Sequence, residues 1–345
     1  MTALEFPLER TERNPRFPSV TSLPSVLAAF SLVCVLGVSG TAFAADYPTK
    51  PIRWVLGFAP GGAPDVLARV VAQQLTGQIG QPVVLDNRAG ANGVIGADLV
   101  SKAAPDGYTM LVTSASFAVN PSAYRKLPFD PVKSFAPITN LCSSPGMLIL
   151  VNTSYPAQTV QQLIEIAKKP GTRLSYGTSG VGNATHLAAA LLQTRTGVPF
   201  THVPYRSGGL VANALMGNEI QFMFTNPATI MPQVKAGRVR ALAYNAPKRS
   251  PLLPDVPTMA EAGVAGMEMD PAWYGVFAPA ATPPAIVSKM QREIRTALAA
   301  APVQERFTGL GCDPVGQPPA EFKAFVQRAI ERAGVLVRIA GIEPE

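Results

Sequence analysis

The residues best suited to binding chemistry lie in a glycine turn. Gly61 and Gly62 come shortly after the apolar segment Trp54–Phe58. The residues that follow, Pro64-Asp65, are typical of the first turn of a helix. Glycine lets a ligand approach the backbone closely, and the free N–H groups of a helix start attract anions. The turn therefore predicts a carboxylate site, although a plain strand-to-helix connection has the same pattern.

A second turn of this kind, Ser179–Asn183, precedes another expected helix. His186 lies in the first turns of that helix, where it is either a packing or capping histidine that hydrogen-bonds to the backbone or a cleft residue that supports the turn. Two expected strands end at Tyr205-Arg206 and at Asn226. Arginine can pair with an anionic ligand and an amide can orient a polar one, but a solvated surface arginine fits the pattern equally well.

Groups that could carry out catalysis are sparse. The two histidines, His186 and His202, lack metal-ligand spacing to another ligating residue, and there is no cofactor-binding motif. The stretch Gly177–Val181 differs from the hydrolase Gly-x-Ser-x-Gly elbow because Val181 replaces the last glycine. The sequence therefore predicts a binding protein with no cofactor and no metal. The alternative is a secreted hydrolase-like enzyme that uses Ser179 or Asp65 in the same cleft.

Strands and helices alternate along the chain, which predicts an α/β fold of two doubly wound parallel sheets with helices on both faces. The chain passes between them twice, so residues 45–146 and 273–345 are expected to form lobe 1 and residues 147–272 lobe 2. Two crossings make a hinge. Ligands bind at the carboxyl ends of such strands and between domains, so we expect a binding cleft there. Strands are expected at 52–58, 82–86, 109–114, 136–141, 147–151, 174–178, 200–205, 220–225, 240–244 and 273–277, and helices from 64 and at 94–103, 159–168, 184–196, 210–216, 284–300 and 319–340.

Charge and composition limit the partners. The net charge of +7 favours anionic small molecules, but lysine and arginine are scattered, which argues against nucleic acid. The apolar run Val26–Val38 is too short to span a membrane, and the small-x-small sequence Ala42-Phe43-Ala44 follows it. We expect residues 1–44 to be a removed signal peptide. Cys142 and Cys312 could form a bridge in an exported protein, but two buried thiols are the expected state.

Motifs spaced along the whole mature chain resemble those of one family, the Bug family of extracytoplasmic solute receptors of tripartite tricarboxylate transporters. Shared patterns include Phe58-x-Pro60-Gly61-Gly62-x-x-Asp65, Asn87-Arg88-x-Gly90-Ala91, Pro105-Asp106-Gly107-Tyr108-Thr109, Tyr176-Gly177-x-Ser179-Gly180-x-Gly182, His186-Leu187-Ala188, His202-Val203-Pro204-Tyr205 and Leu253-Pro254-Asp255-Val256-Pro257.

The resemblance implies a type II periplasmic binding protein, monomeric and located in the periplasm, which closes on a small organic carboxylate. In this family, backbone amides of two opposed loops hold the carboxylate, often with bridging water. Here those loops are Phe58–Asp65 and Thr178–Asn183. The receptor then delivers its ligand to a membrane permease; a sensory receptor that docks on a membrane kinase is the other possible partner class. The predicted ligand-binding set is Phe58, Ala59, Gly61, Gly62, Asp65, Ser114, Thr178, Ser179, Gly182, Asn183, His186, Tyr205, Arg206 and Asn226.

One departure from the family pattern bears on the ligand. The family often carries aspartate before the asparagine that ends strand 220–225, and here Thr225 precedes Asn226. Loss of an acidic group removes a partner for a ligand ammonium. The sequence therefore favours a plain mono- or dicarboxylate over an amino acid.

Overall fold

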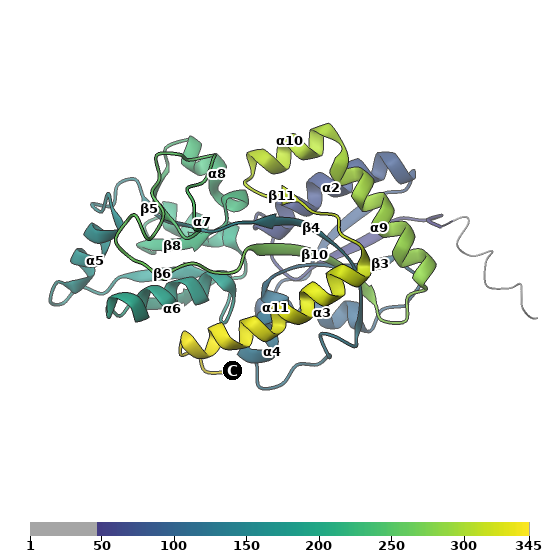
Figure 1. The fold of residues 1–345 in the computed structure, drawn as a ribbon, viewed down its shortest axis with the longest axis horizontal. Coiled ribbons are helices and arrows are strands. Elements are labelled where there is room, and N and C mark those ends of the chain that lie inside the picture. The colour runs from purple at the N-terminus through teal and green to yellow at the C-terminus, as the bar shows by residue number, and fades with distance from the viewer. Residues whose placement is uncertain (1–46, 345) are drawn as a thin grey trace, which may run out of the picture. The chain divides into compact units, whose positions relative to one another are not determined.

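The computed structural model describes residues 47–344, and they form two β-sheets flanked by helices (Figure 1). The predicted signal peptide and its cleavage site lie outside these residues. The first sheet has the strand order β11-β4-β10-β3-β1-β2 and the second β7-β6-β8-β5-β9. The strands of the first sheet are β1 (Ile52–Leu56), β2 (Val83–Asn87), β3 (Thr109–Ser114), β4 (Phe135–Ser144), β10 (Ala272–Pro279) and β11 (Asp313–Pro314). Those of the second are β5 (Leu148–Asn152), β6 (Ser175–Thr178), β7 (Thr201–Pro204), β8 (Phe222–Thr225) and β9 (Val239–Tyr244).

Both sheets are mixed, so the prediction of parallel sheets is wrong in part. In the first sheet β1 is parallel to β2 and β3, but β10 is antiparallel to β3. In the second, β6 is parallel to β7 and β8, but β5 is antiparallel to β8 and β9. The physical reason is the route of the chain. Strands β5 and β10 are the first strands after the chain crosses from one sheet to the other. They do not follow a local helix of the same sheet, and they run antiparallel to the strands that do.

Helices cover both faces of each sheet. We call the first sheet with its six helices the first lobe, and the second sheet with its four helices the second lobe (Figure 1). In the first lobe, α2, α9 and α10 pack on one face and α3, α4 and α11 on the other. In the second lobe, α5 and α6 share one core and α7 and α8 the other. Their bounds are α2 (Ala63–Ile79), α3 (Val94–Ser101), α4 (Ser116–Ala123), α5 (Val160–Lys168), α6 (Ala184–Thr196), α7 (Gly208–Met216), α8 (Pro227–Lys235), α9 (Pro284–Ala299), α10 (Ala301–Gly309) and α11 (Pro319–Ile339).

Helix α2 shows how local sequence sets an element at the predicted turn. Proline at the helix start and Gly80 in the left-handed conformation (φ 69°) define its two ends. Between them Leu67, Val71 and Leu75 recur every fourth residue and are fully buried against the first sheet. The strand that precedes the turn and this helix are both anchored in one core, which fixes the position of the turn between them.

A disulfide joins Cys142 of β4 to Cys312, just before β11, with their Cα atoms 5.8 Å apart. The expectation of two separate buried thiols is therefore wrong. The two cysteines are 170 residues apart in sequence, and only the antiparallel pairing of β11 with β4 brings them together. Both are fully buried in the core of the first lobe.

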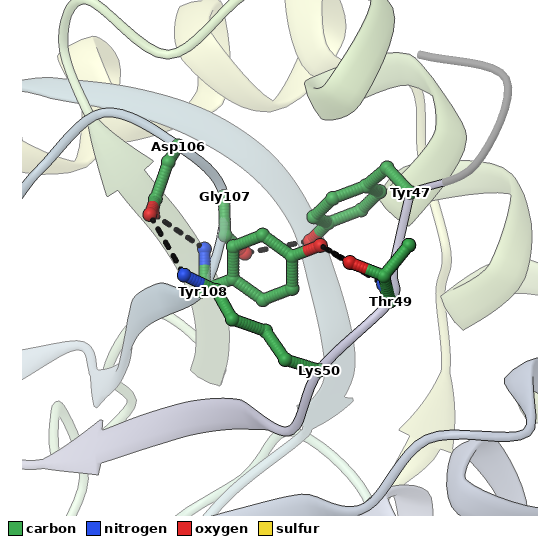
Figure 2. A network of polar contacts seen from close by, with 6 residues as sticks. All are labelled: Tyr47, Thr49, Lys50, Asp106, Gly107 and Tyr108. Atoms are coloured by element: carbon green, nitrogen blue, oxygen red, sulfur yellow. Dashed lines mark hydrogen bonds and ion pairs between the residues drawn. The ribbon is translucent and has the colours of Figure 1, made fainter. Parts of the chain in front are cut away.

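A polar cluster fixes the first described residues beside the first sheet (Figure 2). The Tyr47 hydroxyl donates to the Gly107 carbonyl at 2.6 Å, and the Thr49 N–H donates to the Tyr108 hydroxyl at 2.9 Å. The Lys50 ammonium lies 4.3 Å from the centre of the Tyr108 ring. Because these residues precede β1 and β3, the cluster lies at the amino ends of the strands, and we assign it no part in ligand binding.

Within residues 47–344 no helix has the length and apolar character needed to cross a membrane. The same residues contain no group of three histidine, cysteine or carboxylate side chains placed to hold a metal ion.

Candidate functional site

A cavity lies between the two lobes at the carboxyl ends of their parallel strands. We call it the central cavity. Its lining comes from both lobes and contains no lysine, arginine, histidine, aspartate or glutamate. A ligand held there would be recognised by backbone groups, hydroxyls and amides. The lining consists of Phe58, Gly62, Ala63, Pro64, Ser114, Ala115, Ser116, Ser179, Asn183, Ala184, Thr185, Gly208, Thr225, Asn226, Thr229, Ala272 and Tyr274.

Five helices begin at the central cavity. Helices α2 and α4 start there from the first lobe, and α6, α7 and α8 from the second. The amino end of a helix carries about half a positive charge and exposes N–H groups that have no partner within the helix. With five such ends and no charged side chain in its lining, the cavity favours a small anion.

The N-caps decide which of these N–H groups remain available. In α6 the Asn183 side chain accepts from the N–H groups of Thr185 (2.9 Å) and His186 (3.0 Å), and in α7 Ser207 accepts from Leu210 (3.3 Å). Helices α2, α4 and α8 have no side-chain cap, but the Ser116 N–H of α4 donates to the Ser114 hydroxyl at 3.4 Å, and Pro64 and Pro227 have no N–H. The remaining unpaired N–H groups at these helix starts are available to a ligand.

Asp65 stabilises the conformation of the first predicted turn and does not line the cavity. Its buried carboxylate accepts from the N–H of Gly61 (3.1 Å) and from the side chains of Arg69 (2.9 Å) and Asn87 (3.1 Å). Burial opposes the ionisation of Asp65, but the hydrogen bonds from these groups outweigh it and lower its pKa. Gly61 has a φ of 85°, which glycine adopts without strain.

The two lobes touch beside the cavity through backbone groups. The Ala59 N–H donates to the Arg206 carbonyl at 3.3 Å. A methyl group on Gly209 would lie 3.0 Å from the carbonyl carbon of Gly61, so a side chain there would press the lobes apart. The first predicted turn therefore faces the first turn of α7 in the other lobe.

The second predicted turn rests on two stacked histidines. The Gly182 N–H donates to Nδ1 of His186 at 3.0 Å, and Nε2 of His202 lies 2.6 Å from the Thr178 hydroxyl. The two imidazole rings stack with their centres 4.0 Å apart. His186 does not line the central cavity and hydrogen-bonds to a backbone N–H, so of its two readings the structure shows the backbone-bonded histidine, with its partner in the turn.

These contacts predict a loss of stability in acid. Burial, with a smaller contribution from His202, lowers the pKa of His186 to about 4, and burial lowers that of His202 to about 4. The unfolded chain binds protons from about pH 6.5 downward, whereas the folded chain resists them until about pH 4. The stability that comes from the neutral pair is thus complete above about pH 6.5 and is lost as the pH falls towards about 4.

The measurement is the free energy of unfolding in urea at several pH values across this range. The variant His202→Gln removes one of the two groups, so its stability should fall less steeply with decreasing pH than that of the wild type. A variant with the same slope as the wild type would contradict the assignment.

The predicted site residues lie at four different locations in the structure. Those that line the central cavity are Phe58, Gly62, Ser114, Ser179, Asn183 and Asn226. Ala59, Gly61 and Asp65 shape the turn and the contact between the lobes. Thr178, Gly182 and His186 support the second turn from behind. Tyr205 and Arg206 line a neighbouring cavity, also between the lobes.

Sequence reasoning missed part of the lining, including Ala115-Ser116 at the start of α4, Ala184-Thr185 at the start of α6, Gly208 at the start of α7, Thr229 in α8 and Ala272 in β10. A usable signal was present for α4 alone, because Ser114–Ser116 directly follows a buried strand. Tyr274 lines the cavity, whereas Trp273 packs in the core against Phe322 and Phe325.

Comparison with known proteins places this geometry in a family. The family model described as "Tripartite tricarboxylate transporter family receptor" matches residues 67–342. The periplasmic binding protein BugD is 34% identical and superposes with a TM-score of 0.82 over 87% of this chain and 100% of BugD. Rpa4515 of R. palustris, solved with adipate, is 33% identical, with a TM-score of 0.83 over 87% of this chain and 100% of its own.

A further solved structure, MatC (Rpa3494) from Rhodopseudomonas palustris with bound malate, is 30% identical, with a TM-score of 0.79 over 84% of this chain and 100% of its own. These relatives confirm the two-lobed α/β fold predicted from the sequence. The matches extend over both lobes and include most of the cavity lining. The chain therefore belongs to the receptor family of the tripartite tricarboxylate transporters, and it is a solute-binding receptor and not an enzyme.

Proposed function

We propose that this protein captures a small organic carboxylate in the central cavity, in the periplasm, and delivers it to the permease of a tripartite tricarboxylate transporter. The observation that carries the proposal is the meeting of five helix starts at a cavity whose lining bears no charged side chain. Such a site binds an anion through backbone N–H groups and hydroxyls. Since one chain supplies the whole lining, the proposed receptor acts as a monomer.

The relatives support the ligand class. Rpa4515 was solved with adipate and MatC with malate, and both ligands are dicarboxylates. The location follows the same reasoning, because BugD is a periplasmic binding protein. Delivery to a permease follows from the description of the family, whose members are the receptors of a transporter.

Binding in this proposal closes the lobes about a hinge. The chain crosses between the sheets after β4 and before β10, at residues 145–147 and 245–271. Ligand in the central cavity contacts both lobes at once, so it stabilises the closed form relative to the open one. The contact of Gly61 with Gly209 and the hydrogen bond from Ala59 to Arg206 belong to that closed form.

Plain carboxylates are favoured over amino acids in this site. The lining has no aspartate or glutamate that could pair with a ligand ammonium. Thr225, which stands where the family often carries aspartate, lines the cavity. Burying an unpaired ammonium group costs several kcal/mol, on the order of a thousandfold in affinity.

Thermal unfolding against a panel of ligands tests the proposal. Adipate, malate and succinate are compared with aspartate, glutamate and glucose at equal concentration. A carboxylate present at a hundred times its Kd should stabilise the protein by about 2.7 kcal/mol, while the amino acids and glucose should leave it unchanged. Stabilisation by glucose or by an amino acid, with none from adipate, malate or succinate, would overturn the proposal.

A further inference from the structure

A cavity beside the crossing segments shares no lining residue with the central cavity, and we call it the hinge cavity. It encloses about 460 Å³, against about 50 Å³ for the central cavity on the same measure. Pockets of about 300 to 1,000 Å³ with mainly apolar walls commonly bind small molecules. The apolar part of this wall consists of Pro145, Tyr244, Ala246, Pro247, Pro251 and Leu252.

Both lobes contribute to the hinge cavity. Thr308 of α10 and Asp313 of β11 line it from the first lobe. Residues 246–252 line it from the other side, and they pack on the core of the second lobe through Ala246 and Leu252. A molecule bound in the hinge cavity would therefore contact both lobes.

The first crossing segment lies between the two cavities. Asn226, which lines the central cavity, donates from Nδ2 to the Gly146 carbonyl at 3.3 Å. A methyl group placed on Gly146 would lie 3.0 Å from Cζ of Tyr244, which lines the hinge cavity. Gly146 thus contacts one residue of each cavity, so the two cavities are separate sites.

Two charged side chains of the hinge cavity have no partner in the described part of the chain. Within residues 47–344 neither the Lys248 ammonium nor the Asp313 carboxylate makes an ion pair or a hydrogen bond. Arg249, the remaining charged residue of the lining, is paired with Glu261 at 2.9 Å. The cavity thus presents an unpaired cation from the second lobe and an unpaired anion from the first.

The Asp313 carboxylate lies close enough to the buried Tyr244 to act on its hydroxyl. Burial raises the pKa of Tyr244 to about 12, a hydrogen bond with the Gly146 backbone opposes this shift, and the charge of Asp313 adds to it. A ligand cation beside Asp313 would relieve this repulsion. The first-lobe side of the cavity therefore suits an ammonium group, which the central cavity does not.

We propose that the hinge cavity binds a zwitterionic amino acid with a large apolar side chain. That side chain packs on the prolines and Tyr244, the ammonium group pairs with Asp313, and the carboxylate pairs with Lys248. Because Asp313 and Lys248 belong to different lobes, the bound amino acid favours the arrangement of the lobes in which both groups face the cavity. The inference does not rest on the proposed function, since the two cavities share no lining residue.

Calorimetry with three related compounds tests the site. L-phenylalanine carries both charges, 3-phenylpropanoate lacks the ammonium group, and phenethylamine lacks the carboxylate. The wild type should bind L-phenylalanine about fivefold to tenfold more tightly than either analogue. The variant Lys248→Gln should lose this advantage and bind phenethylamine as the wild type does. The variant Asp313→Asn should also lose it, but should bind 3-phenylpropanoate as the wild type does. Excess adipate and malate should not displace L-phenylalanine.

Lys169→Gln is the matched control. Lys169 is also an exposed lysine of the second lobe, and it does not line the hinge cavity. This variant should bind all three compounds as the wild type does, and thermal unfolding without ligand should show that the variants are folded. The site is overturned if the wild type binds no L-phenylalanine, if adipate and malate displace it, or if the two charge variants keep wild-type affinity for it. None of these outcomes would alter stabilisation by carboxylates, on which the proposed function depends.

Discussion

Replacing Gly62 by phenylalanine is expected to lower carboxylate affinity at least a hundredfold and to leave the fold intact. Gly62 caps α2 with a φ of −78° and a ψ of 163°, values that any residue adopts. A methyl group at this position would lie 3.6 Å from the Gly208 nitrogen and 3.7 Å from Ser207 Cβ, so a larger side chain would extend into the start of α7. Phenylalanine would occupy the cavity and hold the lobes apart, at a cost in cap stability of about 1 kcal/mol.

Calorimetry measures the affinity and thermal unfolding without ligand measures the fold. The control is Gly77→Phe in the same helix, because Gly77 is exposed and has open space around its Cα. That variant should bind as the wild type does. If Gly62→Phe kept wild-type affinity, the helix starts would not form the binding site.

Among the variants proposed for this protein, the one that removes the disulfide is expected to lose the most free energy of unfolding. The bridge closes a loop of 170 residues in the unfolded chain, which the chain-entropy model values at about 5 kcal/mol, and measured losses are typically about 2 to 5 kcal/mol. The double variant Cys142→Ala/Cys312→Ala should therefore unfold at a lower urea concentration, with its free energy of unfolding reduced by an amount in that range.

A reducing agent provides the control for this variant. Reductant should lower the stability of the wild type once it reaches the buried bridge, and it should have no effect on the double variant. A double variant as stable as the oxidised wild type would show that the bridge contributes nothing to stability.

Short patterns predicted most elements well because their ends are set by local chemistry. The strand 109–114 and the helix 184–196 have the predicted bounds. In α6 the asparagine that ends the glycine turn is also the N-cap, so one residue decides both the turn and the helix start. The pattern of apolar and polar residues carries this information within a few residues of sequence.

Three helices, α4, α8 and α10, were not predicted from the sequence. Each contains a proline that makes its sequence pattern less typical of a helix. Pro121 lies inside α4 and Pro232 inside α8. Proline usually ends or kinks a helix, so the pattern there is typical of a loop. Pro302 lies at the start of α10, where it begins a new helix directly after α9. Two of these helices, α4 and α8, start at the central cavity, so the sequence alone undercounted the helix starts that meet there.

The sequence by itself determined that two glycine turns followed by helix starts would lie at strand ends, because turn chemistry and helix capping depend only on neighbouring residues. The tertiary structure decided which helix starts meet at one cavity, where Arg206 lies relative to it, and that Cys142 reaches Cys312. These relations join residues far apart in the chain. They depend on the order and direction of strands in two mixed sheets, which no local pattern of residues specifies.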